Sequence, residues 1–133
     1  MTRRCYGFAR TKMRETCAHG GRGAIRTVRV EQAAEQGAAN FIDLTVVPPG
    51  TSIGVHTHGP TDEEIYIVIS GRGRMSLEDE EFDVGPGDVI VNNRCGTHGL
   101  ENSGSEEIRL VVVEIEAKPL GHVGNSRSRQ EAC

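Results

Sequence analysis

The 133-residue sequence has no tryptophan, and aromatic side chains make up only 4% of it. A hydrophobic core must therefore be built mainly from valine, isoleucine and leucine. A chain of this length is typical of one domain. It is also long enough to bury a substantial core, since a domain of about 150 residues buries roughly 70% of its unfolded surface.

The sequence also lacks an excess of basic residues and a long apolar run. Its 15 basic and 19 acidic residues give a net charge of -4. This balance provides no electrostatic footprint for nucleic acid or for an anionic membrane surface. The basic residues at positions 3 and 4 are not followed by an apolar stretch, so neither a signal peptide nor a transmembrane helix is expected. We expect a cytoplasmic protein with no nucleic-acid or membrane partner.

Cysteine is sparse and shows no paired spacing. The chain has four cysteines, Cys5, Cys17, Cys95 and Cys133. We predict free thiols in a reducing cytoplasm. The alternative is a structural zinc site, although the spacing matches no standard zinc finger. Its ligands would be Cys17, His19, Cys95 and His98. Outside that alternative, His19 has no predicted role.

Most of the chain reads as short β-strands separated by glycine- and proline-containing turns. The predicted strands span residues 24–30, 40–48, 54–58, 63–70, 73–79, 80–85, 88–93, 97–103 and 106–116. Such closely spaced strands predict an all-β antiparallel barrel or sandwich. Residues 31–39 are predicted to form a loop with little helix. The predicted organisation is an N-terminal arm (1–23), a barrel (24–117) and a flexible C-terminal tail (118–133).

Possible metal ligands gather near the start of two of these strands. His56 and His58 are two residues apart and therefore point to the same side of a strand. Glu64 and Tyr66 share one face of the next strand. A hairpin between these two strands would place Glu64 opposite the histidines, and His98 would add a third imidazole. The simpler alternative is a pair of surface histidines on an exposed strand.

Three neutral imidazoles and one carboxylate suit one divalent transition metal ion: Fe, Mn, Ni, Cu or Zn. Open coordination positions would favour a small anionic ligand together with water or dioxygen. Tyr66 is the candidate catalytic acid–base group, unless it only lines the barrel. Arg74 and Arg109 are candidates for binding a substrate carboxylate, unless they only pair with nearby surface acids.

Two motifs in the sequence resemble those of the cupin superfamily, small single-domain members in particular. The first motif has a glycine, five residues, His-x-His, a short gap, a glutamate, six residues and a glycine. Gly50, His56, His58, Glu64 and Gly71 match it. Glu63 would keep the family's shorter gap after the second histidine. Glu64 is favoured because it keeps the spacing to the final glycine, and a shift within the strand would turn every side chain over.

The second motif is matched by Gly85, His98 and Asn102. Cys95 stands where the family pattern has a glycine, so Gly96 is expected to form the tight turn. The resemblance covers roughly residues 40–116. By matching position it assigns four metal ligands, His56, His58, Glu64 and His98.

The resemblance implies a double-stranded β-helix (jelly-roll) barrel and a metal-dependent enzyme acting on a small polar, anionic metabolite. Oxidoreductase chemistry of the dioxygenase kind is the leading expectation. The alternatives are metal-assisted isomerase, lyase or cyclase chemistry, or small-molecule binding without turnover. It also implies a homodimer packed sheet to sheet. Ile65, Ile67 and Ile69 should face away from Glu64 and need a cover.

Overall fold

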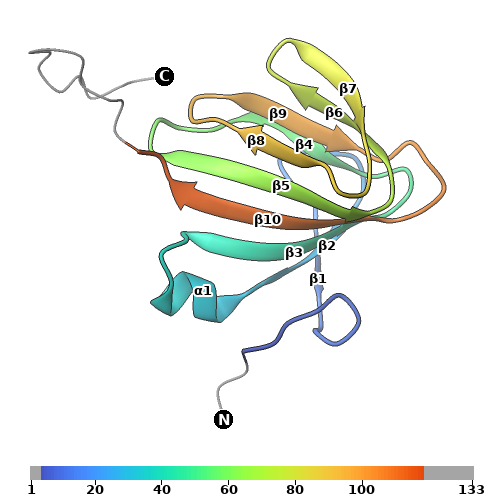
Figure 1. Cartoon of the computed structure of the whole chain (residues 1–133). Coiled ribbons are helices and arrows are strands. Elements are labelled where there is room, and N and C mark those ends of the chain that lie inside the picture. The colour runs from blue at the N-terminus through green and yellow to red at the C-terminus, as the bar shows by residue number, and fades with distance from the viewer. Residues whose placement is uncertain (1–3, 119–133) are drawn as a thin grey trace, which may run out of the picture.

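Ten strands form two antiparallel sheets that face each other in the computed structural model, which describes residues 4–118 (Figure 1). The larger sheet has the order β1 (Arg14–Thr16), β2 (Ile25–Arg29), β3 (Phe41–Val47), β10 (Ile108–Glu116), β5 (Asp62–Ser70), β8 (Val89–Asn92). The smaller sheet has the order β4 (Ser52–Thr57), β9 (Thr97–Glu101), β6 (Gly73–Leu77), β7 (Glu80–Val84). This architecture confirms the predicted antiparallel all-β barrel.

One short helix, α1 (Glu31–Gln36), precedes β3, and the strand β1 lies within the predicted N-terminal arm. No helix among residues 4–118 is long and apolar enough to span a membrane. The predicted C-terminal tail lies outside the described residues, apart from Lys118.

The core lies between the two sheets and follows the alternation of the strands. On β5, Glu64, Tyr66 and Val68 are buried, whereas Ile69 is exposed. The most deeply buried apolar side chains come from both sheets and are Val47, Val68, Met75, Leu100, Ile108 and Leu110. Burial of such side chains removes apolar surface from water and contributes about 1.5–3 kcal/mol for each. The interior is thus apolar toward one end. The buried polar side chains of β5, Glu64 and Tyr66, lie toward the other end.

The predicted hairpin between residues 54–58 and 63–70 is wrong. β4 pairs with β9 in the smaller sheet, whereas β5 pairs with β8 and β10 in the larger one. The chain crosses from one sheet to the other after His58. Alternation along a strand determines which face a side chain occupies, but it does not determine the partner strand. Glu64 therefore approaches the histidines across the interior of the barrel.

Two residues of the motifs shape turns. Gly71, directly after β5, has a φ of 80°, and a Cβ there would lie 2.2 Å from the carbonyl oxygen of Glu107. Only glycine fits such a position without a shift of the backbone. Asn102 is fully buried, and its Nδ2 donates to the carbonyl oxygens of Val47 (2.9 Å) and Glu106 (2.7 Å). These residues fix the end of the barrel away from the histidines.

Candidate metal centre

Three imidazoles from the smaller sheet and one carboxylate from the larger sheet converge in the barrel. His56 and His58 project from β4 and the residue after it, His98 from β9 and Glu64 from β5. Their ligand atoms lie within 4.8 Å of one another. The backbone register explains part of this arrangement, because His56 lies directly opposite His98 in the β4–β9 ladder. The fold therefore brings together the four side chains that the sequence pattern predicted.

The distances describe a tight group. His98 Nε2 lies 3.1 Å from Glu64 Oε1, and His58 Nε2 lies 3.7 Å from the same oxygen. His56 Nε2 and His58 Nε2 are 3.1 Å apart. Glu64 and His98 are buried, whereas His56 and His58 are half-buried. Three Nε2 atoms and one carboxylate oxygen thus face a common point.

Polar groups at the outer edge of the group face the Nδ1 atoms of two rings. His56 Nδ1 lies 2.7 Å from the carbonyl oxygen of Gly54. A carbonyl can only accept, so Nδ1 carries the proton and the lone pair of Nε2 faces the group. His58 Nδ1 points toward Glu114, whose Oε1 is 4.0 Å away. Imidazoles that bind metals are typically oriented in this way by a carbonyl or carboxylate at the other nitrogen. The residues present therefore fit a divalent metal ion.

The protonation states also suit metal binding. Burial, together with the neighbouring imidazoles, lowers the pKa of His56 to about 4. Burial likewise lowers the pKa of His58, although Glu64 opposes this. Burial alone would raise the pKa of Glu64, but the hydrogen bond from His98 and the nearby imidazoles lower it below its ordinary value. At neutral pH His56 and His58 are neutral and Glu64 is a carboxylate, which are the forms that bind metals.

Tyr66 lies beside this group on the same face of β5 as Glu64. Its ring is buried and meets the ring of His98 edge-on, with 5.4 Å between the centroids. Burial, the charge of Glu64 and a hydrogen bond to that carboxylate raise the pKa of Tyr66 well above its ordinary value. The phenol therefore keeps its proton at neutral pH and acts as a donor rather than a base.

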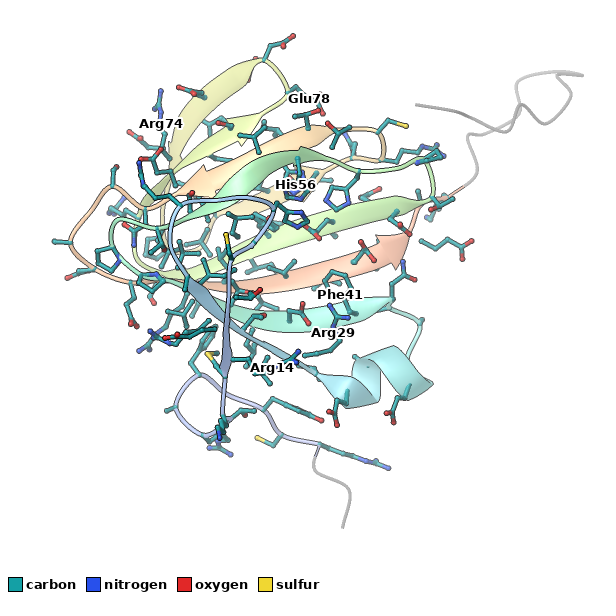
Figure 2. All side chains as sticks on the ribbon, turned by 180° about the vertical axis from the view of Figure 1, so that it is seen from behind. Arg14, Arg29, Phe41, His56, Arg74 and Glu78 are labelled. Carbon is teal, nitrogen blue, oxygen red and sulfur yellow. The ribbon has the colours of Figure 1, made fainter. Side chains whose placement is uncertain are left out.

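Neither of the two arginines predicted to bind substrate reaches the group. Arg74 is exposed at the β6–β7 hairpin and pairs with Asp83 at 3.2 Å; Figure 2 shows it apart from His56. Arg109 is exposed, and its guanidinium lies 5.8 Å from the ring centre of Phe8. Both alternate outward on strands whose neighbouring residues face the core. Their assignment to substrate binding stays a prediction that no contact with this group supports.

Sequence reasoning missed His19. Its ring stacks on that of His56, with centroids 3.5 Å apart and an interplanar angle of 7°. The arm reaches β4 because two glycines allow a close approach: Gly54 donates to the carbonyl oxygen of Ala18 (3.0 Å). A Cβ on Gly54 would lie 2.1 Å from the carbonyl oxygen of His19. In the structure Gly21 and Gly54 lie against each other. The sequence contains both glycines, but it does not show that their segments meet, so it gave no usable signal for His19.

The zinc alternative built on cysteines is wrong. Cys95 takes part in a disulfide bond, so it offers no thiolate to zinc. Cys17 is an exposed free thiol that donates to the carbonyl oxygen of Gly21, and Cys5 is also free, as predicted. The prediction of a free thiol fails at Cys95, because sequence spacing does not show which distant cysteines a fold brings within bonding distance. Cys133 lies outside the described residues.

The tight turn before His98 closes at Gly96, as expected, since its N–H donates to the carbonyl oxygen of Asn93 (3.0 Å). The left-handed residue of this turn is Cys95, however, with a φ of 60°.

A cavity of about 320 Å³ opens beside the ligand group. His58, Glu64 and Tyr66 line it at one end, and His19 and Glu114 also border it. It extends over the inner face of the larger sheet to Arg29, a residue that sequence reasoning did not select. The sequence signal for Arg29 was its spacing on β2: it lies two and four residues after Thr27 and Ile25, so all three side chains share one face of the strand. A ligand in this cavity can contact the His–Glu group at one end and the Arg29–Asp43 pair at the other.

A family model described as "Cupin domain" matches residues 43–114, which include all four of the converging side chains. The chain belongs to the cupin family. This cupin is 34% identical over 76 residues to an uncharacterised protein of Methanocaldococcus jannaschii, covering 57% of this chain and 60% of that protein. It is 27% identical over 97 residues to an oxalate-binding protein of Thermotoga maritima, covering 72% of this chain and 79% of that protein.

Among solved structures, this cupin is similar to a protein described as a predicted oxalate decarboxylase from Thermotoga maritima. The TM-score is 0.76 at 23% identity, and the match covers 82% of this chain and 96% of the other. At this identity the likeness shows the fold alone, which agrees with the jelly-roll barrel expected from the two motifs.

Proposed function

We propose that this cupin is a metal-dependent enzyme that acts on a small polar, anionic metabolite. Oxidoreductase chemistry of the dioxygenase kind is the proposed reaction class. The observation that carries the proposal is the group of three imidazoles and one carboxylate beside a cavity large enough for a ligand. When bound there, Fe, Mn, Ni, Cu or Zn would supply a Lewis-acidic centre and, for the redox-active metals, electron transfer.

The side chains of the His–Glu group and Tyr66 have different proposed roles. His56, His58 and His98 would hold the metal through Nε2. Glu64 is a ligand rather than a general base, because its lowered pKa makes it a weak proton acceptor at neutral pH. Tyr66, which keeps its proton, is the proposed catalytic donor: its hydroxyl would turn from Glu64 to hydrogen-bond to, or protonate, a substrate oxygen in the cavity.

The metal site is tested by elemental analysis of the purified protein. We expect about one divalent metal ion per chain in the wild type and little in a Glu64→Ala, His98→Ala double variant. Glu63→Ala is the matched control, since Glu63 is the adjacent glutamate and lies on the opposite face of β5. A wild type that stays empty after supplementation, or a double variant with full occupancy, would refute the site.

A second candidate function is binding without turnover. The specific observation in its favour is the relative named as an oxalate-binding protein. Oxygen uptake by the metal-loaded protein with small organic acids separates the two. Uptake that depends on the acid and falls at least about tenfold in Tyr66→Phe supports the enzyme. Product formation without uptake would point to isomerase, lyase or cyclase chemistry, and binding without product would point to a binding module.

We also propose a homodimer. The outer face of the larger sheet carries apolar side chains next to its edge strand β8: Val89 and Val91 are 59% and 43% exposed, and Ile69 is 48% exposed. Ile65 and Ile67 lie directly opposite Val91 and Val89 in the β5–β8 ladder. An exposed apolar patch of this kind is typical of an interaction surface. A second copy of the chain would cover it.

A further inference from the structure

The cavity continues well past the metal ligands, and its far end has a charge pattern of its own. Resting on the metal centre proposed above, we infer that this cupin binds an elongated acid rather than a two-carbon dicarboxylate. The acidic, chelating end of the ligand lies at the His–Glu group, and a flat apolar body follows. An uncharged group that donates a hydrogen bond lies at Asp43.

The size of the cavity supports the first part. At about 320 Å³ it lies at the lower end of the range of about 300–1,000 Å³ that is typical of sites for drug-sized ligands. Since a water molecule takes roughly 30 Å³ of the liquid, the cavity corresponds to about ten waters. A two-carbon dicarboxylate is much smaller than a drug-sized ligand and would leave much of this space unfilled.

The sheet register gives the separation of the backbones that border the cavity. Arg29, Asp43, Val112 and Tyr66 stand directly opposite one another in one row across β2, β3, β10 and β5. Neighbouring strands are about 4.8 Å apart, so Asp43 and Tyr66 are separated by two spacings, about 10 Å. Asp43 therefore lies two strands away from Tyr66, so a ligand held at the His–Glu group reaches Asp43 only if it extends across the row past Val112.

The walls favour a flat apolar body. Val112 occupies the row between Asp43 and Tyr66 and is buried. Ile53 lines the cavity from β4 in the opposite sheet. A ring between Asp43 and the metal ligands would therefore pack with one side chain on each face, which removes apolar surface of both from water.

The charges favour an uncharged donor at the far end. Arg29 is the only lysine or arginine lining this cavity among residues 4–118, and it is already paired. Its Nε donates to Asp43 Oδ1 at 2.9 Å and its second nitrogen to Oδ2 at 3.0 Å, while its guanidinium lies 4.2 Å from the ring centre of Phe41. Figure 2 shows Arg29 beside Phe41.

The Arg29–Asp43 pair places carboxylate oxygens at the far end of the cavity, and the positive charge of Arg29 is already paired with them. The two oxygens of a carboxylate offer about four lone-pair positions, so Asp43 can still accept from a ligand. A ligand hydroxyl or amide N–H can donate to Asp43, whereas a second carboxylate has no proton to donate and would find Arg29 already engaged with Asp43.

The test uses two probes that share the chelating end and differ only at the para position. These are 2,4-dihydroxybenzoate, with a hydroxyl, and 4-carboxy-2-hydroxybenzoate, with a carboxylate; oxalate is the third probe. Binding to the Zn²⁺-loaded full chain is measured by isothermal titration calorimetry at pH 7. We expect 2,4-dihydroxybenzoate to bind at least about tenfold more tightly than either of the other two.

Asp43→Asn removes the carboxylate and releases Arg29, so we expect the preference for hydroxyl over carboxylate to fall at least about fivefold. Asp83→Asn is the matched control, because it makes the same change in the exposed Arg74–Asp83 pair outside the cavity; it should keep the wild-type ratio. If the Asp43→Asn variant does not fold, the wild-type ratio alone decides.

The outcomes separate the inference from the proposed function. Equal binding of the two ring probes, an unchanged ratio in Asp43→Asn, or binding of oxalate alone overturns the inference while the metal centre stands. A wild-type chain that does not retain Zn²⁺ overturns the metal centre, and the inference with it.

Discussion

The histidine cluster should make the metal-free protein lose stability in acid, and His56 allows a direct test. Its folded-state pKa of about 4 lies below the ordinary value of 6.5. Between these two pH values the unfolded chain binds a proton at this position that the folded chain does not. The free energy of unfolding must therefore fall as the pH is lowered through this window, and it must be independent of His56 above it.

The size of the effect follows from the two pKa values. The difference between 6.5 and about 4 corresponds to a ceiling of about 3 kcal/mol, at roughly 1.4 kcal/mol per pH unit. His56 is only half-buried, so solvent screening reduces the expected contribution to about 1 kcal/mol at pH 4.5. The lowered pKa of Glu64 acts in the same direction, since a carboxylate stabilised in the folded state loses that contribution as the pH falls.

Comparison with His56→Gln isolates the histidine, because Glu64 is present in both proteins. Unfolding by urea is followed by circular dichroism at pH 7.5, 5.5 and 4.5, with a chelator present to keep both proteins metal-free. The wild type should lose about 1 kcal/mol more than the variant between pH 7.5 and 4.5. Parallel losses in the two proteins would show that the folded cluster does not hold His56 neutral.

Two further predictions concern a turn and the outer face of the larger sheet. Gly71→Ala should destabilise the protein by at least about 1–2 kcal/mol more than Gly87→Ala in urea unfolding. Both glycines have positive φ, 80° and 90°, but only at Gly71 would the new Cβ meet a carbonyl oxygen; equal losses would contradict this. A Val89→Asp, Val91→Asp double variant should be monomeric by light scattering at concentrations where the wild type is dimeric. Val55→Asp, an equally exposed valine of the other sheet, should leave the mass unchanged, and a monomeric wild type would rule out the dimer.

The strands and their faces could be predicted from the sequence, because alternation has a period of two and is a local property. The predicted strands agree with the structure to within a few residues, apart from the missed β1. The choice of Glu64 over Glu63 also followed from parity: Glu64 is buried with the histidines, and Glu63 is on the other face. The glycine at position 71 and Asn102 were recognised from the motif resemblance instead, because their contacts with Glu107 and Val47 join segments far apart in the chain.

Tertiary structure alone decided what depends on segments far apart in the chain. Strand pairing placed β4 and β5 in different sheets, so Glu64 meets His56 and His58 across the barrel rather than along a hairpin. It brought the arm to β4, which set His19 on His56, and it aligned Arg29 with Asp43 at the far end of the cavity.

The physical reason is that these contacts join residues with no periodic relation in sequence. A local pattern indicates which way a side chain points, but the closing of long loops and the packing of two sheets determine what it meets. The sequence by itself determined the ligand types and their faces. The fold decided the geometry of the four converging side chains, their neighbours and the shape of the cavity beside them.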